Sequence, residues 1–259
     1  IVRHPEDTRL VKLSEGEWTA CRDDPATLLE HLGYSGWHTT RKFRLFCCAA
    51  ARSAARHAEL SVAELLCVAE ADAEGVADPA DLAKALARVE EYMHPANNRL
   101  RRRRHGWFKA HRWRWNAVYA TFLALDPSRQ ANEWRSAVSI ARLETWPPNE
   151  PTEVELSARV ALVRDIFECP FRPPSCRVDP RRLTDTAITL ARGIAADQAF
   201  DRLPILADAL QESDCEDPEV LTHCRGCSQH VRGCWVVDLV LGLGVALYAE
   251  PGAAPDTAG

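Results

Sequence analysis

The sequence predicts an all-α protein of about nine to eleven helices. Apolar residues recur every three or four positions along most of the chain, as one face of an amphipathic helix requires. Helix-start signals separate these stretches, and the period-two alternation that is typical of strands is nearly absent. Hydrophobic residues make up 46% of the 259 positions and charged residues 27%, a balance typical of globular proteins. We therefore expect one large helical domain or two helical subdomains.

Two kinds of signal mark the helix starts. A Ser or Thr followed three residues later by Glu forms a capping box, in which both side chains satisfy backbone N–H groups; this pattern starts at Ser14, Ser61 and Thr152. An Asp before a Pro places an N-cap acid next to a residue that has no backbone N–H, which costs nothing at the first helical position. This pair starts at Asp24, Asp78, Asp126, Asp179 and Asp217. Gly33 and Gly75 are expected to end helices.

The segments between these signals have apolar stripes at helical spacing. The stripes cover residues 43–54, 62–73, 82–93, 108–125, 156–167 and 200–210. Residues 234–243 contain three valines, which favour strands. Because Trp235, Leu239 and Gly242 fall on one side of a helix and no partner strand is recognisable, we predict a helix there as well.

Two proline-rich stretches, residues 146–151 and 169–174, cannot continue a helix. The first is the better candidate boundary. It predicts an Ala/Arg/Trp-rich helical domain over residues 14–146 and a C-terminal helical domain over residues 152–243, and it leaves open whether the two fold separately. Residues 1–13 are expected to form a flexible N-terminal extension and residues 250–259 a disordered tail.

Charge and cysteine usage limit the classes of protein. The chain has 32 Lys and Arg against 37 Asp and Glu, a net charge of −5, which excludes a uniformly basic nucleic-acid coat. No segment reaches the roughly 18–20 apolar residues of a membrane helix, so no membrane association is expected. Cys47, Cys48 and Cys67 sit among alanines and leucines at helical positions, as buried free thiols do. Together with the lack of a signal peptide, this predicts a cytoplasmic protein.

No complete catalytic motif occurs in the sequence. A Gly-x-Ser-x-Gly elbow, a phosphate-binding P-loop and a His-Glu-x-x-His pair are all absent. We therefore predict no cofactor and no catalytic residue. The leading hypothesis is a non-enzymatic helical protein-interaction or regulatory module that binds an unknown protein partner.

A basic segment, residues 99–115, supports a nucleic-acid-binding alternative. Tryptophans are interleaved with cations that could contact phosphates: Arg101, Arg102, Arg103, Arg104, Lys109, Arg112 and Arg114. The acidic stretches 64–91 and 197–219 offer internal partners for these charges, so nucleic acid is not the favoured ligand. In that interpretation Phe108, Trp115 and Phe122 share a buried helix face, while the four arginines are exposed or face acids.

A third hypothesis, a metal protein or an enzyme, rests on the loop from His223 to Cys234. Its weak ligand set is Cys224, Cys227, His230 and Cys234, residue types that bind Zn²⁺. The gaps before the His and the last Cys are shorter than in a zinc knuckle. We therefore predict no metal site and expect these four side chains not to converge.

Three motifs resemble an uncharacterised bacterial family that is expanded in planctomycetes. The first combines residues 17–21 (EWTAC), 24–25 (DP) and 41–46 (RKFRLF); the second is 164–173 (RDIFECPFRP); the third combines 200–210 (FDRLPILADAL), 223–226 (HCRG) and 230–238 (HVRGCWVVD). The resemblance covers roughly residues 14–57 and 155–242. Family members usually have a residue other than Cys at the position of Cys227. The resemblance implies no established activity.

Overall fold

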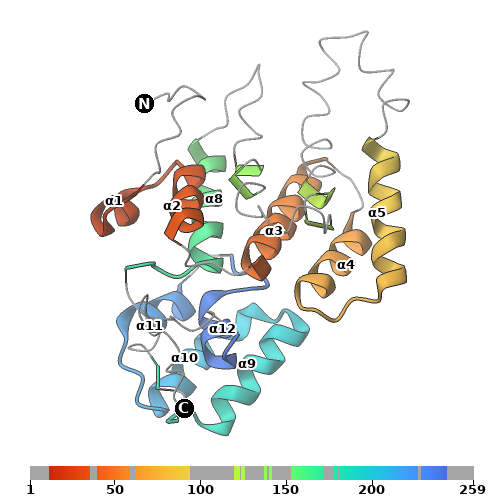
Figure 1. Cartoon of the computed structure of the whole chain (residues 1–259). Coiled ribbons are helices and arrows are strands. Elements are labelled where there is room, and N and C mark those ends of the chain that lie inside the picture. Colours follow the sequence, from red (N-terminus) through yellow and green to blue (C-terminus); the bar gives the residue numbers. More distant parts are fainter. Residues whose placement is uncertain are drawn as a thin grey trace, which may run out of the picture.

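Figure 1 shows a computed structural model of the chain. It describes residues 12–35, 40–58, 62–93, 120–122, 124–125, 137–138, 140–141, 153–171, 178–179, 181–226 and 229–243. These residues form helices, turns and loops, with no strand among them, which confirms the all-α prediction. No helix in these ranges is both long enough and apolar enough to cross a membrane.

The helices with defined bounds follow the labels of Figure 1. They are α1 (Glu15–Ala20), α2 (Pro25–Ser35), α3 (Thr40–Ala58), α4 (Ala63–Ala73), α5 (Pro79–Met93), α8 (Glu153–Ile166), α9 (Asp185–Asp197), the 3-10 helix η5 (Phe200–Arg202), α10 (Leu203–Glu212), α11 (Pro218–Arg225) and α12 (Trp235–Leu241). The helix predicted over 234–243 is thus present, despite its valines. It ends at Gly242, whose left-handed backbone (φ 67°) suits a residue without a Cβ.

Several helix starts follow the sequence signals. Ser14 and Glu17 form the capping box of α1, with both of its hydrogen bonds present. Asp24, Asp78 and Asp217 accept backbone N–H bonds at the starts of α2, α5 and α11, each of which begins at the following proline. These side chains replace the intrahelical acceptors that the first turn lacks.

Two other signals, at Asp179 and Gly33, lead to different local structures. Asp179 accepts N–H bonds from Arg181 and Arg182 in a turn, and α9 starts later, after the N-cap Thr184. The N-cap of α4 is Val62, which has no side-chain cap bond, and Ser61, from which a capping box is predicted, lies outside the described residues. Gly33 lies inside α2 rather than at its end. Glycine is tolerated within a helix when tertiary packing supplies most of the helix stability.

The apolar side chains form two cores. The first contains α1–α5 together with α8, which packs against α2 and α3. The second contains α9–α12, which lie at the lower end of the view in Figure 1. Among the described residues the first core reaches Phe167 and the second begins at Val178, on either side of the second proline-rich stretch.

The two cores meet where α3 approaches the loop before α12. Gly233 in that loop has a φ of +89°, and a Cβ built on it would lie 2.8 Å from Cδ1 of Leu45. Only glycine allows both this conformation and this close approach. The ammonium of Lys42 in α3 is buried there, 2.6 Å from the carbonyl oxygen of Ile166.

Candidate metal centre

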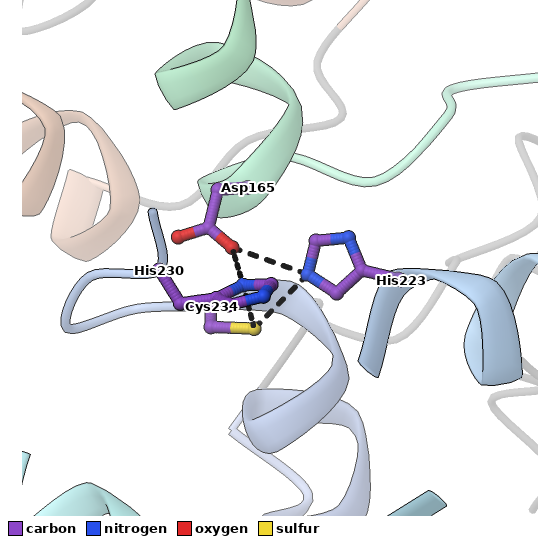
Figure 2. Close-up of side chains that lie close together, drawn as sticks. All are labelled: Asp165, His223, His230 and Cys234. Atoms are coloured by element: carbon purple, nitrogen blue, oxygen red, sulfur yellow. Dashed lines mark hydrogen bonds and ion pairs between the residues drawn. The ribbon is translucent and has the colours of Figure 1, made fainter. Parts of the chain in front are cut away.

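Four polar side chains converge in the interior between the two cores, as Figure 2 shows. Asp165 comes from the last turn of α8 and His223 from the last turn of α11, while His230 and Cys234 belong to the segment that joins α11 to α12. One ligand atom from each residue lies within 4.8 Å of the other three. We call these four residues the DHHC cluster.

Local structure aims the two residues of the connecting segment. α11 ends at Arg225, and the chain returns so that the N–H of Cys234 donates to the carbonyl of Val231 in a turn. Gly233 supplies the left-handed position of that turn. Cys234 is then the N-cap of α12, and its carbonyl accepts the N–H of Asp238 as the first bond of the helix. His230 and Cys234 therefore lie on the two arms of one tight turn.

The four donor atoms are close to the spacing of a coordination shell. Nε2 of His223 lies 3.1 Å from Oδ1 of Asp165 and 3.2 Å from Sγ of Cys234. Nδ1 of His230 lies 2.6 Å from the same Oδ1 and 4.0 Å from Sγ. Ligands of a tetrahedral Zn²⁺, with metal–nitrogen distances near 2.0–2.1 Å and metal–sulfur distances near 2.3 Å, are about 3.3–3.6 Å apart. The observed separations bracket that range.

Asp165 is the centre of the polar contacts. Besides its two histidine contacts, its Oδ2 accepts the backbone N–H of Val231 at 2.8 Å. Burial raises the pKa of this carboxyl, but hydrogen bonds and charge from His223 and His230 outweigh it and hold the pKa below its ordinary value. The side chain is thus an anion at neutral pH, and only 2% of its surface is exposed to solvent.

Cys234 is fully excluded from solvent. Burial raises the pKa of its thiol well above the ordinary value, and the negative charge of Asp165 raises it further. A thiolate is the form that ligates metals, and a coordinated cation deprotonates such a thiol. A cation placed between them would therefore stabilise both the Asp165 carboxylate and the ionised form of the Cys234 thiol.

A second layer of contacts orients His223. The indole N–H of Trp235 lies 3.2 Å from Nδ1 of His223, and the two rings are 5.1 Å apart. The His223 and His230 rings meet edge to face at 4.8 Å. Because an indole nitrogen can only donate, the Trp235 contact places the hydrogen of a neutral His223 on Nε2, where it points to Asp165.

The geometry does not match a Cys-His-Asp catalytic triad. In such a triad the base contacts the nucleophile with one ring nitrogen and the acid with the other. Here Asp165 and Cys234 both face Nε2 of His223, and both face Nδ1 of His230. Four donors around one point are instead the pattern of a closed, structural metal site.

The sequence-derived ligand set overlaps this cluster only in part. His230 and Cys234 belong to it, whereas Cys224 is buried in the second core and is not one of the four donors. Cys227 lies outside the described residues. Asp165 and His223 are not in the ligand set predicted from the sequence, although His223 begins the loop that carries that set. One physical signal was available for Asp165, since an acid in the last turn of a helix opposes the helix dipole and needs another partner.

The candidate nucleic-acid residues lie outside the described ranges. These are Arg101, Arg102, Arg103, Arg104, Lys109, Arg112 and Arg114, and the same holds for Phe108 and Trp115. Phe122, the described member of the predicted apolar face, is partly buried and packs against the first core.

No protein-family model, curated protein or solved structure matches the chain.

Proposed function

We propose that this chain is a metal-binding helical protein, with one Zn²⁺-class cation held by Asp165, His223, His230 and Cys234. The observation that carries the proposal is the convergence of four ligand atoms within 4.8 Å in a buried position. Buried polar groups normally have hydrogen-bond partners, and here a carboxylate, two imidazoles and a thiol face one another around a single centre. A cation at that centre would neutralise the carboxylate and the thiolate together.

The ligand chemistry favours zinc over magnesium or calcium. Magnesium and calcium prefer shells of oxygen ligands, and this cluster offers one carboxylate, two imidazoles and one thiolate. Zinc accepts all three types in tetrahedral sites. Because the cluster supplies four protein donors, such an ion would have a complete shell and a structural role.

The structural role follows from where the ligands originate. Asp165 belongs to a helix of the first core, while the other three ligands come from α11 and the segment leading into α12, which are part of the second core. A cation at the cluster would therefore fasten the two cores together. This role agrees with the hypothesis of a non-enzymatic module, in which the metal stabilises a scaffold and takes part in no reaction.

The interaction surface of such a module stays a prediction. Large exposed apolar side chains in the described ranges belong to four separate segments: Val76, Val154, Ile205 and Leu243. Residues 99–115, which carry the nucleic-acid hypothesis, lie outside those ranges. The DHHC cluster is thus the better supported starting point for function.

Metal analysis of the purified chain tests the proposal. We expect about one zinc per chain by inductively coupled plasma mass spectrometry, after dialysis against buffer without chelator. Replacement by Co²⁺ should give the visible bands of a tetrahedral site and a thiolate-to-cobalt charge-transfer band. A folded wild-type chain that retains no metal, or an octahedral cobalt spectrum, contradicts the proposal.

Two cysteine variants provide a matched comparison. Cys234→Ser removes a proposed ligand, and we expect at least tenfold weaker zinc binding with loss of the charge-transfer band. Cys224→Ser changes a buried thiol of the same motif that lies outside the cluster, so its metal content and spectrum should equal those of wild type. Equal losses in both variants would mean that the metal responds to general unfolding and not to ligation.

Trp235 offers an independent reporter. Coordination through Nε2 of His223 moves the ring hydrogen to Nδ1, the side that faces the indole N–H. Metal binding must therefore lengthen that contact and change the environment of the indole. We expect zinc addition to change the tryptophan fluorescence of wild type and to leave that of Trp235→Phe nearly constant.

A further inference from the structure

A cavity of about 670 Å³ opens between α3, α4 and the segments 198–200 and 229–232. Its apolar wall is formed mainly by Leu45, Ala49, Ala55, Val62, Leu66 and Phe200. Arg52, Glu70 and Arg232 supply its charged wall. Volumes of this size, with apolar walls and a few convergent polar groups, are typical of small-molecule sites.

The charged wall has more cations than anions. Nε of Arg52 donates to Oε1 of Glu70 at 3.0 Å, and Nε of Arg232 lies 3.4 Å from Oε2 of the same carboxylate. Two guanidinium groups thus share one buried acid. This excess of one positive charge faces the cavity.

Neighbouring cations of α3 are balanced differently. Arg41 and Lys42 face two acids, Glu74 and Asp238. Arg44 pairs with Asp72. The imbalance around Glu70 is therefore a local feature of the cavity and not a property of the whole helix.

Arg232 is incompletely paired. Its Nε alone, among the buried side-chain nitrogen and oxygen atoms of the described residues, lacks a hydrogen-bond acceptor. Glu70 is the one ion-pair partner of this guanidinium within the described ranges, at a distance too long for a good hydrogen bond. A guanidinium offers five N–H donors. The Nε of Arg232 is closed off from solvent, so the four donors on its two terminal nitrogens are the ones that remain for a ligand in the cavity.

We propose that this cavity binds a small organic carboxylate, an anion with one negative charge and an apolar alkyl or aryl body. Arg232 and Arg52 would hold the carboxylate, and the apolar wall would bury the body. A guanidinium matches a carboxylate with two parallel hydrogen bonds, and both gain strength in a partly desolvated site. A phosphate dianion fits less well, because its second charge would face Glu70.

This site adjoins the DHHC cluster, because His230 is a proposed metal ligand and also lines the cavity. Arg232 follows His230 by two positions, on the other side of Val231, whose N–H is fixed by Asp165. The carboxylate proposal needs no metal, and its test therefore uses the zinc-saturated and the chelator-treated full chain in parallel.

Isothermal titration calorimetry with 3-phenylpropanoate and its neutral amide, 3-phenylpropanamide, tests the charge requirement. We expect the carboxylate to bind at least tenfold more tightly than the amide, with an affinity that falls as NaCl rises from about 50 to 300 mM. Equal affinities for acid and amide, or no heat from either ligand, would overturn the proposal. Displacement of 3-phenylpropanoate by equimolar inorganic phosphate would also overturn it, because it would show a general anion site.

Two arginine variants locate the site. We expect Arg232→Gln to weaken 3-phenylpropanoate binding at least tenfold and Arg52→Gln to weaken it as well. Arg182→Gln is the control, since Arg182 pairs with Asp214 on the exposed surface. Circular dichroism shows whether each variant keeps the helix content of wild type. If Arg232→Gln does not fold, the comparison of acid and amide binding to the wild-type chain still decides the proposal. Unchanged affinity in a folded Arg232→Gln would contradict it.

Discussion

The half-buried Arg41 in α3 and the buried Asp238 in α12 form an ion pair through two hydrogen bonds, with N···O separations of 2.7 and 3.1 Å. Lys42, the next residue, lies 3.0 Å from the same carboxylate. One acid of the second core thus holds two adjacent cations of the first core. Glu74 completes the group by binding the other side of Arg41 at 2.8 and 2.9 Å.

Asp238→Asn should destabilise the protein strongly. Removing the acid takes away the carboxylate that lies 3.0 Å from the buried ammonium of Lys42, and it leaves Arg41 with Glu74 as its acidic partner. Breaking one side of a buried pair costs about 3–5 kcal/mol of unfolding free energy. Urea unfolding followed by circular dichroism measures this change.

Asp214→Asn is the matched control for this experiment. Asp214 forms an exposed pair with Arg182, and exposed pairs contribute at most about 1 kcal/mol. A loss from Asp238→Asn no greater than the loss from the control would show that the buried pair does not hold the cores together.

The same carboxylate predicts how stability depends on pH. Burial raises the pKa of Asp238, but the charges of Lys42 and Arg41 and their hydrogen bonds lower it below its ordinary value. A group whose pKa is lower in the folded state stabilises the fold above its unfolded pKa, near 3.9, and loses this contribution as pH falls toward the folded pKa. We expect the urea midpoint to fall between about pH 5 and 3, and to fall less steeply in Asp238→Asn. Parallel slopes in the two proteins would rule out this group as the source.

Local signals were enough to predict the fold class and many helix ends. Asp24, Asp78 and Asp217 cap helices because an N-cap acid acts on N–H groups two or three residues ahead of it. Asp179 also precedes a proline, but it closes a turn, because the next helix, α9, begins only after its N-cap Thr184. An Asp before a Pro therefore predicts a hydrogen bond to a backbone N–H, and tertiary packing decides whether that bond starts a helix or closes a turn.

The candidate metal centre could be predicted only in part. His230 and Cys234 lie close together in the sequence, so spacing alone selected them as candidates. Asp165 reaches the cluster from α8, and its distance along the chain conceals the contact. Cys224 and Cys234 belong to the same sequence motif and are both buried in the second core, but only Cys234 supplies a donor atom to the cluster. Periodicity shows which face of a helix is apolar, and it does not show which distant helix meets that face.

Two glycine substitutions should act in opposite directions. Gly233→Ala would place a Cβ 2.8 Å from Cδ1 of Leu45 and force alanine to a φ of +89°. Strain of this kind costs about 1–3 kcal/mol. Gly193→Ala lies within α9, where the added Cβ meets no atom within 4 Å other than those of its neighbours and its own helix backbone, and it should stabilise the helix by about 0.5–1 kcal/mol. Thermal unfolding of both variants measures the contrast, and a neutral Gly233→Ala would show that the loop moves without cost.

Cysteine reactivity should separate buried from exposed thiols in the folded protein. Cys67 is exposed on α4, so the expectation that it is buried is wrong, whereas Cys48 and Cys224 are buried. Burial raises the pKa of the Cys224 thiol to about 12 and that of Cys48 well above its ordinary value, with the charge of Glu70 adding to the effect on Cys48. Only the thiolate reacts with iodoacetamide, so these two should remain unmodified at pH 8 while Cys67 is alkylated within minutes. Peptide mass spectrometry assigns each site, and urea-unfolded protein, in which all three should react, is the control. Rapid alkylation of Cys48 under native conditions would contradict the packing of α3 against α4.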